Sequence, residues 1–86
     1  MDSGLENDLV EIRGLIIPME WDRRGKPISV AISGFDEKTY VIEKGAKRQK
    51  LLNLLKKEIK AMVRIQKVYN QNVLIRIESY ELVNGA

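Results

Sequence analysis

The chain has 86 residues, a net charge of +3, and neither cysteine nor histidine. This composition predicts one small domain and excludes disulfides, thiolate zinc sites, cysteine nucleophiles and histidine bases. No apolar run approaches the ~18 residues that span a bilayer, and the acidic start lacks the apolar segment of a signal peptide. We therefore expect a cytoplasmic, non-enzymatic protein with no membrane partner, cofactor or metal.

Residues 1–8 are polar and aperiodic, which predicts a loose N-terminal tail before a single domain over 9–83, with a short tail at 84–86. From Leu9 the pattern alternates in the manner of a half-buried strand. Gly14 lies where the strand becomes apolar on both faces, which indicates a long, bent first strand that serves two sheets. Pro18 limits its ladder because proline has no N–H to donate.

Residues 19–27 are polar and contain breakers, so we expect a loop or flared hairpin tip there. The second strand, at 28–33, alternates strictly, with Ile28, Val30 and Ile32 predicted to face inward. A turn at Gly34 and Asp36 leads to a third strand at 39–43, which is rich in β-branched and aromatic residues.

A helix is predicted over about 46–57, with a leucine stripe at 51, 52, 54 and 55 that lies on the core. A longer helix reaching Met62 is disfavoured because residues 59–65 alternate and end in β-branched side chains. The fourth strand is expected at 59–69, and an Asn-rich turn separates it from a fifth strand at 73–82. Val73, Ile75 and Ile77 of that strand are predicted to face inward.

Five short strands can bury one face each and hide their edges by closing into a barrel. The bent strand at 10–16, the helix between strands three and four, and the closing pair at 62–68 and 73–77 resemble the oligonucleotide/oligosaccharide-binding fold, or OB-fold. This resemblance implies a mainly β, five-stranded Greek-key barrel with one helix, in the order β-β-β-α-β-β. An SH3-like barrel suits the helix position less well, and a ferredoxin-like fold needs two helices.

The OB-fold resemblance implies a site along strands two and three, flanked by the loops that join strands one to two and four to five. We therefore predict a single-stranded DNA or RNA ligand, with rings stacking on bases and cations following phosphates. The candidate residues at these positions are Trp21, Arg23, Arg24, Lys26, Ser29, Ala31, Tyr40, Tyr69, Asn70 and Asn72. Depending on register, Val41 takes the outward place of Tyr40.

Three structural readings compete with this site. Trp21 can instead cover the barrel end, Tyr69 can pack at a strand end, and the Ser/Ala face of the second strand can be an ordinary solvated face. Glu20 and Asp22 beside Trp21 also oppose phosphate binding. The outward apolar residues Leu15, Ile17 and Leu74 suit a protein partner or self-association.

Residues 44–67 hold nine Lys and Arg against one acid, Glu58, most of them predicted on the helix and away from the ligand cleft. They form either a second polyanion surface or a solubilising face. The candidates for that surface are Lys47, Arg48, Lys50, Lys56, Lys57, Lys60, Arg64 and Lys67.

Overall fold

The computed structural model describes residues 9–83, except for the side chain of Ala46, so the tails expected at 1–8 and 84–86 lie outside the described residues. The elements are β1 (Leu9–Trp21), β2 (Pro27–Gly34), β3 (Thr39–Ile42), α1 (Ala46–Leu51), the 3-10 turn η2 (Leu52–Leu54), β4 (Glu58–Tyr69) and β5 (Asn72–Leu82). The predicted class, mainly β with one helix in the order β-β-β-α-β-β, is confirmed.

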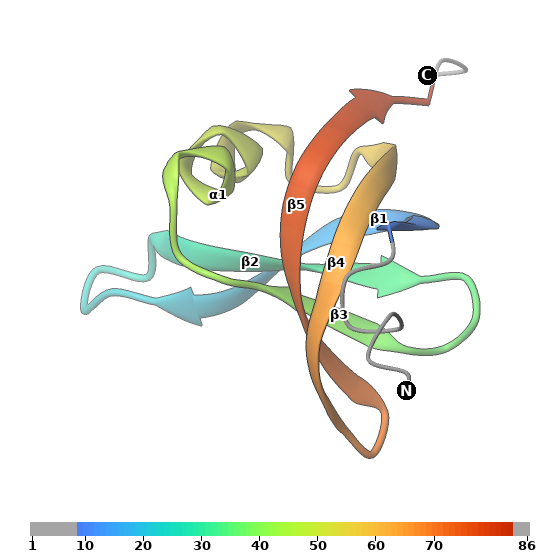
Figure 1. The fold of residues 1–86 in the computed structure, drawn as a ribbon. Helices are drawn as coiled ribbons and strands as arrows, with labels where there is room; N and C mark the ends of the chain where they lie inside the picture. The colour runs from blue at the N-terminus through green and yellow to red at the C-terminus, as the bar shows by residue number, and fades with distance from the viewer. Residues whose placement is uncertain (1–8, 84–86) are drawn as a thin grey trace.

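The strands form a closed barrel in the order β1-β2-β3-β5-β4, and β4 pairs with β1 to complete the ring (Figure 1). All pairs are antiparallel except β3 with β5. β1 pairs with β4 through residues 9–15 and with β2 through 14–21, so the predicted long strand with two partners is confirmed. Gly14 belongs to both ladders, and a Cβ there would overlap the Ser33 carbonyl.

The core is built from the inward half of each alternating strand, mostly Ile and Val, because β-branched side chains pack well on a pleated surface. Leu51 is fully buried among them, and Leu52, Leu54 and Leu55 pack against the same cluster. The leucine stripe therefore seats α1 on the barrel, as predicted. No helix within residues 9–83 combines the length and apolar character that crossing a bilayer requires.

Two predicted boundaries are wrong. β1 continues beyond Pro18 to Trp21, because Pro18 still pairs with Val30 and a bulge at Met19 restores the ladder. The α-helix ends at Leu51 rather than near 57. The Lys56 N–H donates to the Ile16 carbonyl over 2.7 Å, which pulls the chain away from helical geometry and onto β1.

Candidate functional site

The tip of the β1–β2 hairpin is a tightly bonded turn. Asp22 Oδ1 accepts the backbone N–H groups of Arg24 at 2.8 Å and Lys26 at 2.9 Å. Gly25 adopts φ 83°, a left-handed conformation that favours glycine. Arg23, Arg24 and Lys26 are consequently displayed to solvent on a fixed backbone.

Trp21 ends β1 at the base of this tip, paired with Pro27, and 53% of its surface is exposed. The ring therefore lies outside the core cluster, and about half of it is accessible to a ligand. If Trp21 covers the barrel end, that role uses only the buried half of its side chain. The exposed tryptophan and the three cations come from six consecutive positions, which brings a stacking surface and positive charge together.

The β4–β5 hairpin carries the second aromatic group. Tyr69 is 48% exposed and pairs with Asn72, while Asn70 turns the chain at φ 53°. The Lys67 ammonium lies 5.3 Å from the centroid of the Tyr69 ring, within cation–π range. Tyr69, Asn70 and Asn72 are all exposed, as a ligand-binding role requires.

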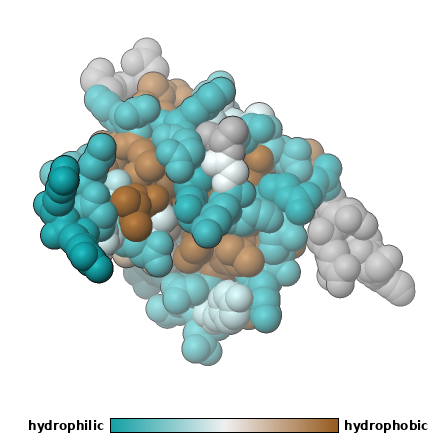
Figure 2. Space-filling view, turned by 90° about the vertical axis from the view of Figure 1, so that its left-hand side faces the viewer, coloured by the Kyte–Doolittle hydropathy of each residue, from teal (hydrophilic) through white to brown (hydrophobic). Residues whose placement is uncertain are grey.

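An outward-facing row connects the two hairpins across the barrel wall. Register places Ile17 opposite Ala31, Ala31 opposite Val41, Val41 opposite Leu74, and Leu74 opposite Lys67. The side of the molecule that bears the β1–β2 tip and α1 shows hydrophobic patches among hydrophilic groups (Figure 2). Ile17, Val41 and Leu74 of this row are partly exposed, so they offer apolar contact along the curved outer wall between the two aromatic ends.

Three predicted contact residues are not accessible. Ser29 is 5% exposed and donates its hydroxyl to Glu20 Oε1 over 3.1 Å, and Ala31 is fully covered within its row. Tyr40 is 5% exposed and belongs to the core, so the outward place on β3 is that of Val41. Ile28, predicted to face inward, is 45% exposed because irregular pairing with Glu20 and Trp21 shifts the alternation.

Tyr40 has a structural role at the other end of β2. Its hydroxyl donates to Asp36 Oδ2 over 2.6 Å. Burial, together with this bond and the charge of Asp36, raises the pKa of Tyr40 to about 12. The same bond lowers the pKa of Asp36 from its ordinary value. The tyrosine therefore anchors the β2–β3 turn and is removed from the candidate site.

The two carboxylates that flank Trp21 are bonded internally. Glu20 accepts from Ser29, and Asp22 accepts from the turn backbone. Their oxygens thus shape the hairpin, although their charges still oppose an anion nearby.

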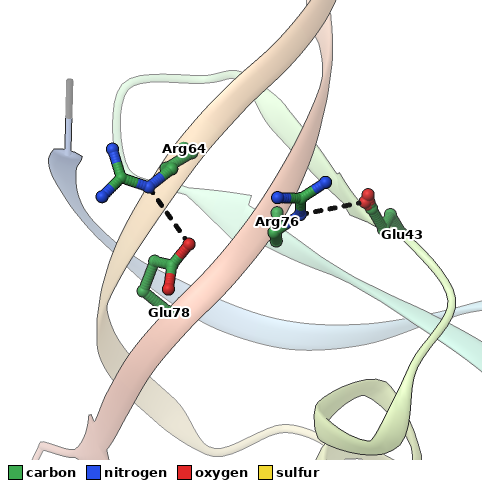
Figure 3. A network of polar contacts seen from close by, with 4 residues as sticks. All are labelled: Glu43, Arg64, Arg76 and Glu78. Atoms are coloured by element: carbon green, nitrogen blue, oxygen red, sulfur yellow. Dashed lines mark hydrogen bonds and ion pairs between the residues drawn. The ribbon is translucent and has the colours of Figure 1, made fainter. Parts of the chain in front are cut away.

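The basic stretch is divided among several surfaces. On the β4–β5 wall, Arg64 pairs with Glu78 at 3.1 Å, and Arg76 pairs with Glu43 at 3.5 Å (Figure 3). Lys60 pairs with Glu81 at 3.1 Å. Lys47 and Arg48 line a groove beside α1, whereas Lys50, Lys56 and Lys57 are exposed outside it.

Sequence reasoning missed Arg76 and Lys44 as candidates, although both line that groove. The alternation of β5 places Arg76 outward, two positions after Leu74, and this signal was present in the sequence. Within residues 9–83, no three His, Cys, Asp or Glu side chains gather in a way that could hold a metal ion.

No protein-family model, curated protein or solved structure matches this chain.

Proposed function

We propose that this chain is an OB-fold module that binds single-stranded DNA or RNA without catalysing a reaction. The observation that carries the proposal is the half-exposed Trp21 beside three solvent-facing cations on a rigid hairpin. Support for the OB-fold comes from the barrel order, the parallel pairing of β3 with β5, and a helix seated between β3 and β4. A cytoplasmic location stays a prediction from the cysteine-free composition.

The ligand path runs from the β1–β2 hairpin to the β4–β5 hairpin. Trp21 and Tyr69 stack on bases, and each stack contributes ~1–3 kcal/mol without demanding a particular base. Arg23, Arg24 and Lys26 neutralise phosphates at one end, and Lys67 does so at the other. Between them, Val41 and Leu74 give apolar contact to sugars and base faces.

Titration of the protein with dT and rU homopolymers tests this function, with Trp21 fluorescence as the reading. We expect saturable quenching and a log K that falls with log salt by about 0.7 per phosphate contacted. If Trp21 fluorescence does not change at low salt with either DNA or RNA, the proposal is wrong.

A protein-interaction module is the second candidate. Leu15 is 40% exposed on the outer face of β1, two positions before the partly exposed Ile17. Leu74, also partly exposed, lies three strands from Ile17 in the same outward row. Light scattering over a concentration series separates the two functions. A stable oligomer that binds neither dT nor rU homopolymer favours the protein-interaction module.

A further inference from the structure

A groove of about 510 Å³ lies between the end of β3, the start of α1 and the middle of β5. Its charged lining consists of Lys44, Lys47, Arg48, Arg76, Glu43 and Glu78. Its lining also includes Ile42 and Ile77, which are buried, so the charged groups lie beside the apolar core.

The two acids of the groove are already held by arginines. Glu43 pairs with Arg76 at 3.5 Å, and Glu78 pairs with Arg64 at 3.1 Å (Figure 3). Within the described part of the chain, Lys44, Lys47 and Arg48 form no ion pair. The groove therefore has an excess of positive charge that its own carboxylates leave unneutralised.

Arg48 adds a second observation. Its Nε is buried and has no hydrogen-bond partner among residues 9–83. Buried donors in folded proteins are nearly always satisfied, so this N–H calls for an acceptor. This Nε has no accessible surface in the structure, so a phosphate in the groove reaches it only when the Arg48 side chain turns outward; the planar guanidinium then donates parallel N–H groups to two phosphate oxygens.

The groove also adjoins the outward row. Arg76 follows Leu74 as the next outward residue of β5, and Glu43, the residue just after β3, follows Val41 in the same way. A strand that lies on Val41 and Leu74 thus reaches the groove at the next outward positions. Part of the basic stretch is therefore continuous with the candidate interface rather than remote from it.

We infer that this groove is a phosphate-binding subsite, in which Arg48, Lys44 and Lys47 hold a backbone phosphate of the bound strand. The inference rests on the proposed function and extends it to a surface that the hairpins do not reach. Arg76 remains paired with Glu43 and forms the edge where the strand enters.

Two double variants with equal loss of charge test the subsite. Lys44→Ala/Lys47→Ala removes two groove cations, and Lys50→Ala/Lys57→Ala removes two exposed cations of the same stretch outside the groove. Binding of a labelled dT or rU oligonucleotide is measured by anisotropy from low to moderate salt. The groove double is expected to bind about tenfold more weakly than the control double, with a salt slope lower by about 0.7 for the lost phosphate. Arg48→Lys, which keeps the charge but loses Nε, is expected to weaken binding in the same direction.

If the two double variants bind equally well and with equal salt slopes, the phosphate-binding subsite is rejected, while the proposed function is unaffected. Absence of binding by the unchanged protein ends both. Inorganic phosphate, added at constant ionic strength while the Arg48 Nε–H resonance is followed by NMR, distinguishes the source of the anion. If phosphate alone produces a saturable shift and the two double variants bind the oligonucleotide equally well, the groove binds a free anion. The proposal that it holds a phosphate of the bound strand is then rejected.

Discussion

The two turns at the ends of β2 use the same bonding device and differ in how they are anchored. At the β1–β2 tip, Asp22 accepts two backbone N–H groups, and at the β2–β3 turn Asp36 accepts the Lys38 N–H at 3.1 Å. Each turn also presents an aromatic residue, Trp21 at 53% and Phe35 at 62% exposure. Only Asp36 additionally holds a core side chain, the Tyr40 hydroxyl.

This difference separates a turn that supports the fold from one that is available for binding. The β2–β3 turn is bonded to the core through Tyr40 and packed around the buried Gly34. Among residues 9–83, the β1–β2 tip is hydrogen-bonded only to itself, and it carries three cations where the other turn has Asp36, Glu37 and Lys38. Changes in one turn should therefore affect stability, and changes in the other should affect affinity.

The largest expected contrast is between two glycine substitutions. A Cβ at Gly34 would lie 2.5 Å from Asp36 Oδ1 and 2.8 Å from Tyr40 Cε2, whereas a Cβ at Gly25 meets nothing within 4 Å. Gly34→Ala should cost about 2–3 kcal/mol of unfolding free energy through overpacking. Gly25→Ala should cost only about 1 kcal/mol, from its φ of +83°. Urea denaturation followed by circular dichroism measures both, and equal losses would remove the distinction between the turns.

The next largest expected difference is between the two exposed aromatic residues, and it is measured as oligonucleotide affinity. Trp21→Ala should weaken oligonucleotide binding by about 1–3 kcal/mol through the loss of one stacking surface. Phe35→Ala is the matched control, because Phe35 lies about 25 Å away along the eight residues of β2. Anisotropy of a labelled strand gives both values. A loss with Phe35→Ala as large as that with Trp21→Ala would mean that binding is not confined to the β1–β2 side.

The same contrast explains what the sequence could predict. The order of the elements along the chain follows from hydrophobic periodicity, and the two ladders of β1 follow from the position of Gly14. The packing of α1 on the core follows from the spacing of its leucines. All three are local signals in the sequence. The hairpin cations and Trp21 were predictable as exposed because a polar loop with breakers projects from a sheet.

Accessibility on β2 and β3 was not predictable in this way. The burial of Ser29 depends on a bulge at Met19 and on a bond to Glu20, and no single strand encodes this cross-strand register. Tyr40 and Val41 were equivalent by pattern until the Asp36 bond and the pairing with Leu74 fixed their faces. The groove likewise depends on the parallel pairing of β3 with β5, which brings the end of β3 beside the middle of β5.

A smaller effect is expected from Tyr40→Phe, which should cost about 1–2 kcal/mol because a hydrogen bond to a carboxylate is lost. The pKa of Tyr40 is raised from 10 to about 12 in the fold, so its contribution is complete below pH 10 and is lost as the pH rises towards 12. The stability gap between the unchanged protein and Tyr40→Phe should therefore shrink over that window. Urea titrations at several alkaline pH values measure the gap, and a constant gap would contradict the assigned bond.

The smallest effect concerns the charge of Asp22. Asparagine keeps a side-chain oxygen that can accept the Arg24 and Lys26 N–H groups and removes the negative charge beside Trp21. Asp22→Asn should therefore leave stability nearly unchanged and tighten strand binding at low salt by less than about 1 kcal/mol, an effect that salt screens. Asp36→Asn is the counterpart, expected to lower stability through Tyr40 and to leave affinity unchanged. If Asp22→Asn instead weakened binding at low salt, the carboxylate would be a ligand contact rather than a turn element that repels phosphate.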